Sequence, residues 1–334
     1  MVYGTWYLNV TDSRKDELVA FVKSIILEDE IMLLSLNGDA SFRRYFRVYG
    51  KNLIAVDAPP KTQKNKEFIA IDAALLSVGI RAPKIIASDL DNGFMLIEDL
   101  GETTFASVAV GKLQESYYLK AVGLLPKLAS LNRHLDLPKF EEAFIKFELS
   151  IFDEWMLEKR LGVILTKDER ESLNEAYEYI TSNLVKQPYV AMHRDFHSRN
   201  LMVCENDDLA VIDFQDMVYG PICYDLASIV YDCYVDLDFD LKVKLCEITF
   251  EKYRHEGYIE EVNFESFRKQ VLLTSLQRHI KVLGIFCRLS LRDGKHGYLK
   301  DLPRVIKYVL HECDSDIHFS KLKEIIEKYV VGNF

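Results

Sequence analysis

Three polar residues in the middle of the chain have the types and spacing needed to transfer a phosphoryl group. Asp195 lies in the run Met-His-Arg-Asp-Phe-His-Ser-Arg-Asn-Leu, five residues before Asn200. A carboxylate can accept the proton of a substrate hydroxyl, and a nearby amide oxygen can hold a metal ion on nucleotide phosphates. Asp213 ends the next apolar run, where a second carboxylate can bind magnesium. We therefore predict that Asp195 is the catalytic base and that Asn200 and Asp213 hold the metal.

The spacing of Asp195 and Asn200 is that of the H-R-D-x-x-x-x-N pattern of kinase catalytic loops. Apolar runs at 189–192 and 201–204 flank the loop, and a third run at 209–212 leads to Asp213. These runs predict short strands that fix both ends of the loop. A polar turn with solvated charges is the alternative interpretation, but it accounts for neither Asn200 nor Asp213.

The order of the predicted elements indicates an α+β fold with two lobes. Residues 1–100 are rich in strand patterns at 41–49, 52–56, 82–87 and 93–97, with helices predicted from Asp12 or Ser13 to about 27 and at 66–76. Residues 101–334 are mainly helical, with amphipathic patterns at 117–131, 144–161, 167–184, 267–289 and 302–310. We predict a nucleotide-binding lobe at 1–100, with a hinge at its end, and a helical lobe at 101–334 that carries the catalytic loop and the substrate pocket.

Composition excludes several other classes of protein. The formal net charge of −10 disfavours binding to nucleic acid or to an anionic membrane. No segment reaches the roughly 18 apolar residues of a membrane span. The six cysteines form no C-x-x-C pair, which is typical of a reduced compartment. We expect a cytoplasmic protein whose partners are small molecules; its oligomeric state does not follow from the sequence.

With these motifs the chain resembles the superfamily of aminoglycoside phosphotransferases and choline kinases. His193, Asp195, His197 and Asn200 match its H-x-D-x-H-x-x-N loop, and Asp213 matches its metal-binding aspartate. The resemblance implies a bilobal protein-kinase-like fold, ATP and Mg²⁺ as cofactors, and a small hydroxyl compound as acceptor. It also implies that His193, His197 and Asp225 support the catalytic loop.

Further motifs are similar to those of the cell-wall sugar kinases of bacterial peptidoglycan recycling. They lie at 43–47, 57–60, 193–202, 212–216 with Gly220-Pro221, and 277–292. This likeness implies that the acceptor is the anomeric hydroxyl of N-acetylmuramate or N-acetylglucosamine. The alternatives are another acceptor (an aminoglycoside, choline or homoserine) and a pseudokinase that has lost activity.

One position departs from the kinase pattern. Asp57 stands where protein kinases carry the lysine of V-A-I-K, and a carboxylate cannot bind phosphate by itself. Either other cations bind the phosphates, with Arg43, Arg44 and Arg47 the nearest candidates, or the protein is an inactive kinase. An exposed pair of arginines at a strand edge is the structural alternative for Arg43 and Arg44.

The remaining candidate site residues lie in both predicted lobes. At the lobe boundary, backbone groups of Glu98 and Leu100 are expected to bind the adenine edge. In the helical lobe, Glu148 and Trp155 are seven apart, which on an α-helix puts them on one face and suits a pyranose; a partly buried tryptophan with an unrelated glutamate is the alternative. Arg194 and Asp216 are further candidates for the substrate.

A basic stretch in 276–292 is the last candidate for the acceptor site. Lys281 and Arg288 in it could receive a sugar carboxylate, although a solvated helix face is the commoner role of such charges.

Overall fold

The computed structural model describes residues 12–36, 43–131 and 135–334, which fall into two compact units. One, which we call the sheet unit, is drawn from Met1–Asp72 and Pro83–Gly101. The other, the helical unit, consists of Ala73–Ala82 and Glu102–Phe334. The presence of one unit built on a sheet and another that is mainly helical confirms the predicted α+β class.

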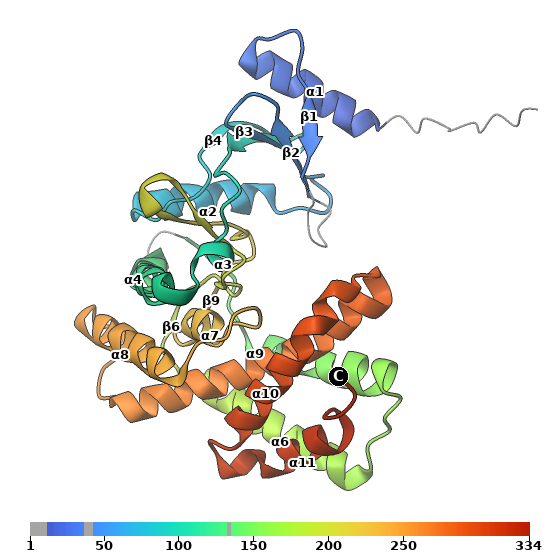
Figure 1. Ribbon diagram of the computed structural model, residues 1–334, viewed down its shortest axis with the longest axis vertical. Helices are drawn as coiled ribbons and strands as arrows, with labels where there is room; N and C mark the ends of the chain where they lie inside the picture. Colours follow the sequence, from blue (N-terminus) through green and yellow to red (C-terminus); the bar gives the residue numbers. More distant parts are fainter. Residues whose placement is uncertain (1–11, 37–42, 132–134) are drawn as a thin grey trace, which may run out of the picture. The chain divides into compact units, whose positions relative to one another are not determined.

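The sheet unit is built on an antiparallel sheet that has five strands in the described residues, in the order β1-β2-β3-β5-β4 (Figure 1). The strands are β1 (Leu33–Ser35), β2 (Arg44–Val48), β3 (Leu53–Asp57), β4 (Ile85–Asp89) and β5 (Phe94–Glu98). The strand predicted at 41–49 corresponds to β2, while its first two positions lie outside the described residues.

Helix α1 (Ser13–Ile26) covers one face of this sheet (Figure 1). Leu18 and Val22 of the helix are fully buried and pack with Phe46, Ala55 and Leu96 of three strands. Asp12 caps the helix by accepting a hydrogen bond from the backbone N–H of Lys15. The predicted helix from Asp12 or Ser13 is therefore confirmed.

The two faces of β2 have different surroundings, because successive side chains in a strand point to opposite sides. Phe46 packs toward α1, so Arg44 shares the α1 face, whereas Tyr45 and Arg47 point the other way. This alternation decides which arginines can reach a ligand on the face away from α1. The second helix of this part of the chain, α2 (Asn65–Ser77), begins in the sheet unit.

The helical unit carries the remaining elements. They are α3 (Phe105–Val108), η1 (Gly111–Leu113), α4 (Gln114–Ser130), α5 (Glu142–Ile151), η3 (Phe152–Arg160), α6 (Lys167–Leu184), β6 (Tyr189–Met192), β7 (Leu201–Val203), η4 (Glu205–Asp207), β8 (Leu209–Val211), β9 (Val218–Pro221), α7 (Tyr224–Val230), α8 (Phe239–His255), α9 (Phe264–Asp293), η5 (His296–Asp301), α10 (Leu302–Cys313), η6 (Ile317–Phe319) and α11 (Ser320–Tyr329). The predicted helices at 117–131, 167–184, 267–289 and 302–310 and the three strands around the catalytic loop are confirmed.

Two features of the helical unit were not predicted. Strand β9 pairs with β6, although its Tyr-Gly-Pro sequence is typical of a turn. The helix predicted at 144–161 changes at Phe152 from α-helical to π-helical winding, which continues to Arg160. Hydrogen bonds to the fifth residue make each π-turn wider than an α-turn.

The long helix α9 is the centre of the helical core and contacts α5, η3, α7 and α10 (Figure 1). Gly284 brings it very close to the junction of α5 and η3. A Cβ atom at this glycine would lie 2.3 Å from the carbonyl oxygen of Ile151, so no larger residue fits without moving the backbone. This close approach fixes α5 against α9, and both helices contribute side chains to the site described below. None of the helices in the described parts of the chain is long and apolar enough to cross a membrane.

Candidate active site

The catalytic loop of the helical unit connects two short buried strands. β6 ends at Met192, and β7 begins at Leu201. β6 pairs with β9 and β7 pairs with β8, so each end of the loop is anchored by its own two-stranded sheet. The candidate residues Asp195 and Asn200 are therefore held on a loop whose backbone is hydrogen-bonded into a strand pair at each end.

Two buried aspartates hold the loop backbone by accepting hydrogen bonds from its N–H groups. The Asp225 carboxylate accepts hydrogen bonds from the backbone N–H groups of His193 (2.7 Å) and Arg194 (3.0 Å). Asp232 accepts from the backbone N–H groups of Ser198 and Tyr234, both at 2.8 Å. Burial raises the pKa of Asp225, and these backbone donors together with His193 partly offset the rise. The contacts of Asp225 support the role proposed for it in fixing the loop.

Asp232 was missed by the sequence reasoning. It lies seven residues after Asp225, just beyond α7, and its side chain is fully buried. The sequence feature that could have revealed it is a second aspartate seven residues after Asp225. Asp232 is important because its carboxylate accepts a hydrogen bond from the backbone N–H of Ser198, in the middle of the loop.

The two loop histidines occupy different environments. His193 Nε2 donates a hydrogen bond to the carbonyl oxygen of Ile212 (3.0 Å), which links the loop to the residue before Asp213. The His197 ring stands edge-on to Tyr234, with centroids 5.2 Å apart. Burial lowers the pKa of His197, so its imidazole is neutral near pH 7. These contacts favour the predicted role of both histidines in supporting the loop, which remains a prediction.

Asp195 is held as a carboxylate. Burial by itself would raise its pKa, but Lys281, His197, Arg194 and His193 outweigh that effect and lower the pKa to about 2. A carboxylate with this pKa is a weak base and a constant hydrogen-bond acceptor at neutral pH. This suits phosphoryl transfer through a loose transition state, in which the hydroxyl is oriented first and loses its proton late.

Asn200 and Asp213 lie at the open end of the β7–β8 hairpin. Leu201 pairs with Val211, and the carbonyl oxygen of Asn200 accepts a hydrogen bond from the backbone N–H of Ile212 (3.1 Å). The Asn200 Nδ2 group donates to the carbonyl oxygen of Asp195 (3.0 Å), so the amide oxygen is the end left for a ligand. The Asp213 carboxylate is exposed and accepts from Gln215 Nε2 (2.7 Å).

Two residues of this site have a left-handed backbone. The φ angle is 76° at Arg194 and 62° at Asp213. Non-glycine residues in this region cost free energy and are retained where the surrounding structure dictates the geometry. At Arg194 the two Asp225 hydrogen bonds impose the conformation, and at Asp213 the hairpin end and Gln215 do so.

A buried polar network joins the loop to α5 and α9. The Glu148 carboxylate accepts hydrogen bonds from Arg194 Nη2 (2.9 Å), Gln277 Nε2 (3.0 Å) and Lys281 Nζ (3.5 Å). Lys281 also donates to the Tyr224 hydroxyl at 2.9 Å. Glu148 is only 3% exposed, and its oxygens are bonded to protein donors. Its predicted contact with a sugar, and that of Arg194, are therefore less well supported than a role in holding the loop.

Trp155 does not share a helical face with Glu148 as predicted. The π-helix η3 begins at Phe152, between the two residues, so seven positions no longer make two α-helical turns. Trp155 instead packs on the core of the helical unit, and Lys159 Nζ lies 3.7 Å from its ring centroid. Asp216 is half-buried in the turn between Asp213 and β9, and its contact with substrate stays a prediction.

The sheet unit explains the unusual aspartate at position 57. Its carboxylate is 1% exposed and pairs with Arg14 of α1 and Arg44 of β2, both at 2.5 Å. Arg44 also pairs with Asp12. Asp57 thus faces α1, and its ion pairs stabilise the sheet unit. The ion pairs of Arg44 engage the guanidinium that was predicted to bind phosphate.

Arg43 is not an exposed strand-edge residue. It is 3% exposed, and its guanidinium carbon lies 4.7 Å from the centroid of Phe68 on α2. At the end of the sheet unit, the Arg47 guanidinium pairs with Asp99 at 2.5 Å, between the predicted hinge residues Glu98 and Leu100. Asp99 also accepts from the backbone N–H of Gly101. The segment of Glu98 and Leu100 is therefore fixed to β2.

Comparison with known proteins decides the family. Residues 33–253 match the family model described as the phosphotransferase enzyme family, and this match includes the catalytic loop and Asp213. The chain belongs to this family. Its fold also resembles solved structures: a choline/ethanolamine kinase family protein from Mesorhizobium loti shares 16% identity at a TM-score of 0.63, over 93% of this chain and 99% of the other. Aminoglycoside phosphotransferase APH(2'')-Ib, solved with ADP, gives a TM-score of 0.56 at 17% identity, over 87% and 97%.

Several more similar relatives carry one name, N-acetylmuramate/N-acetylglucosamine kinase. The protein from Pseudomonas putida is 32% identical over 90% of this chain and 89% of its own length. That from Pseudomonas aeruginosa is 34% identical, covering 83% and 82%. That from Neisseria meningitidis is 33% identical, covering 89% and 90%. The predicted kinase-like fold and family of this phosphotransferase are thereby confirmed.

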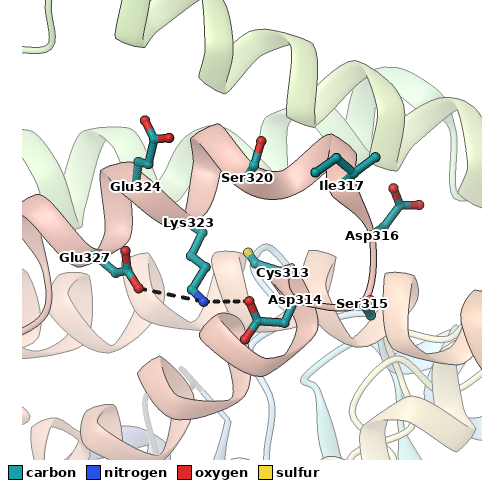
Figure 2. A pocket seen from close by; sticks show the side chains of 9 residues that line it. All are labelled: Cys313, Asp314, Ser315, Asp316, Ile317, Ser320, Lys323, Glu324 and Glu327. Atoms are coloured by element: carbon teal, nitrogen blue, oxygen red, sulfur yellow. Dashed lines mark hydrogen bonds and ion pairs between the residues drawn. The ribbon is translucent and has the colours of Figure 1, made fainter.

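A hollow in the surface of this phosphotransferase lies elsewhere, at the turn between α10 and α11. Its lining includes Asp314, Lys323 and Glu327, and Figure 2 shows Lys323 reaching toward both acids. None of the predicted site residues lines this hollow. It is lined by four acids and a single lysine and contains none of the groups argued for phosphoryl transfer, so we assign it no part in the reaction.

Proposed function

We propose that this phosphotransferase is an ATP-dependent kinase that phosphorylates the anomeric hydroxyl of N-acetylmuramate or N-acetylglucosamine. The observation that carries the proposal is the pairing of an ionised Asp195 with Asn200 and Asp213 on one rigid loop and hairpin. The relatives named for these sugars match over most of the chain and supply the acceptor. A cytoplasmic location, where ATP is available, is part of the proposal.

In the proposed reaction Asp195 accepts a hydrogen bond from the sugar hydroxyl and aims its oxygen at the γ-phosphate. The proton moves to this carboxylate as the new P–O bond forms and the bond to ADP breaks. The Asp225 and Asp232 carboxylates keep the loop backbone in place, so the acceptor hydroxyl meets a fixed group. Catalysis is then mainly positioning and charge neutralisation.

Asn200 and Asp213 fit Mg²⁺. An amide oxygen and a carboxylate are hard oxygen ligands, and Mg²⁺ on nucleotides is commonly held by one or two protein groups together with phosphate oxygens and water. The hydrogen bond from Asn200 Nδ2 to the loop orients the amide, and Asp213 is exposed. When bound, the ion would neutralise the charge on the transferred phosphate. Asp216 is proposed to bind the acceptor or to assist this site.

For the nucleotide we propose Arg43, with the backbone of Glu98 and Leu100, on the sheet unit. Arg43 precedes a strand whose Tyr45 and Arg47 point away from α1, whereas Arg44 is engaged by Asp57 and Asp12. A guanidinium is well suited to phosphate because its fork can make two parallel hydrogen bonds. The ion pairs of Arg44 therefore favour Arg43 as the phosphate-binding residue.

The neighbouring arginines provide a matched pair of variants. Arg43→Met is expected to raise the KM for ATP about tenfold or more, because a charge-assisted contact to phosphate is lost. Arg44→Met is expected to lower thermal stability and to change the KM for ATP less, since buried Asp57 loses one of its two cations. Steady-state kinetics with varied MgATP and thermal melts of both variants measure this. A larger KM effect at Arg44 would reverse the assignment.

The proposed function is tested by ADP release with MgATP and four acceptors: N-acetylmuramate, N-acetylglucosamine, kanamycin and choline. Turnover with the amino sugars, and an acid-labile phosphate on the anomeric carbon by ³¹P NMR, is the expected result. Turnover with kanamycin or choline alone would keep the roles of Asp195 and Asn200 but replace the acceptor. Tight MgATP binding without turnover on any of the four would contradict the proposed function.

A further inference from the structure

A half-exposed arginine stands on the catalytic loop beside the metal-binding amide. Arg199 follows Asp195 by four residues and directly precedes Asn200. Its guanidinium carbon lies 3.5 Å from the centroid of the Tyr234 ring, and 37% of the side chain is exposed. Stacking on an aromatic ring holds a guanidinium flat and leaves its N–H edge open to a ligand.

The other cations around the loop are engaged or inaccessible in the part of the chain that the structure describes. Arg194 donates to Glu148 and lies over Phe144. Lys281 and Arg278 are 6% and 3% exposed, and they donate to Tyr224 and Ser228 respectively. Arg199 is therefore the loop cation best placed to meet an acidic ligand.

Tyr234 ties this arginine to the catalytic base. The backbone N–H of Tyr234 donates to Asp232, the same carboxylate that holds Ser198 in the loop. The Tyr234 ring also stands edge-on to His197, which is two residues from Asp195. The Arg199 guanidinium is thus held in a fixed position relative to the Asp195 carboxylate. A group that selects the substrate must be fixed relative to the group that orients the reacting hydroxyl.

The existing partner of Arg199 does not prevent this role. Arg199 Nη2 lies 3.6 Å from Asp301 Oδ2, an ion pair that is longer than a hydrogen bond. Asp301 has a second cation, Arg304, at 3.3 Å. When Arg199 turns to a ligand, buried Asp301 keeps a counter-charge.

We infer that Arg199 binds the carboxylate of an acidic acceptor sugar and so selects N-acetylmuramate over N-acetylglucosamine. The inference rests on the proposed function. The two sugars differ by one group, the lactyl ether on C3, which brings a carboxylate. A guanidinium fork matches a carboxylate, while Tyr298, whose ring centroid lies 5.8 Å from the Arg199 guanidinium carbon, offers apolar surface to the sugar ring. The residue that binds the substrate carboxylate is therefore on the catalytic loop. It is not Lys281, because the ammonium group of that lysine is buried.

The test compares kcat/KM for N-acetylmuramate, its methyl ester and N-acetylglucosamine in the wild type and in Arg199→Gln. In the wild type, esterification is expected to lower kcat/KM about tenfold to a hundredfold, mainly through KM. In Arg199→Gln, the ratio of kcat/KM for the acid to that for the ester is expected to approach one. Arg199→Lys keeps the charge but lacks the fork, so it should retain part of the preference. Arg292→Gln, an exposed arginine paired with Asp293, is the charge-matched control.

Each outcome separates this inference from the proposed function. A wild type that phosphorylates the sugars, with a preference for the acid over its ester that Arg199→Gln leaves intact, overturns the role of Arg199 alone. Equal losses on all three acceptors show a structural or phosphate-binding arginine and overturn it too. A wild type that phosphorylates none of the three overturns the proposed function, and the inference with it. Thermal melts of each variant exclude loss of folding as the cause.

Discussion

Asp195→Asn is expected to lower kcat by a factor of about 10² to 10⁴, which corresponds to roughly 3 to 5 kcal/mol in the barrier. The substitution keeps the shape of the side chain but removes the charge that accepts the hydroxyl proton. Because the pKa of Asp195 is about 2, the wild-type group is ionised throughout the usual assay range, and lowering the pH to 5 would not mimic the variant. Single-turnover and steady-state rates with saturating MgATP and N-acetylglucosamine measure the loss.

A measurement of nucleotide binding distinguishes a catalytic role of Asp195 from a structural one. MgATP affinity of Asp195→Asn, measured by calorimetry, is expected to stay within about threefold, since Asn200 and Asp213 are unchanged. Asp208→Asn is the matched control, because this exposed aspartate lies on the same hairpin, away from the loop. A wild-type kcat in Asp195→Asn would disprove the assignment of the base. Joint loss of activity and MgATP binding would instead indicate a distorted metal site.

The contiguous part of the site could be predicted from the sequence. Asp195 and Asn200 lie on one loop, and the next hairpin brings Asp213 next to Asn200. The number of residues between them in the sequence therefore predicts how they are arranged in space. The strands at 189–192, 201–203 and 209–211 were predictable for the same reason, since short apolar runs between polar turns have few alternatives.

The supporting groups come from distant segments, and spacing could not reveal them. Lys281 reaches Glu148 from a helix more than a hundred residues away, and its burial contradicts a solvated position for this residue, whereas Arg292 of the same stretch is exposed. Local sequence equally hides the partners of Asp57, because Arg14 lies on a helix that packs across the sheet. The motif that aligns Asp57 with a kinase lysine does not say which face of the strand the side chain takes, so it could not reveal these partners.

Helical periodicity failed where the winding changed. Glu148 and Trp155 are seven apart, but the π-helical segment from Phe152 removes the shared face. The π-helical segment begins where Gly284 of α9 comes close to Ile151. We therefore attribute the change from α- to π-helical winding to packing against α9 and not to local helix propensity. Such packing is a tertiary effect that no window of the sequence contains.

Glu148→Gln is expected to destabilise the helical unit by about 3 to 5 kcal/mol. The carboxylate is the common partner of half-buried Arg194 and buried Lys281, and its neutralisation leaves Asp195 as the carboxylate that still stabilises both cations. Thermal and urea unfolding of the variant measure the loss. Glu142→Gln is the control on the same helix, because that glutamate is exposed and pairs with Lys146 at the surface, where the expected effect is at most about 0.5 kcal/mol.

The same variant distinguishes loop support from sugar binding. A substrate contact at Glu148 would raise the KM for the sugar and leave the unfolding free energy unchanged. Loop support lowers stability first and kcat with it, because Arg194 adjoins Asp195 and takes its left-handed backbone from the fixed loop. Combining Glu148→Gln with Lys281→Met removes a buried cation together with its partner, so the double variant should regain part of the lost stability. Additive losses would show that Glu148 and Lys281 act independently, and the network would then not be the unit that holds the catalytic loop.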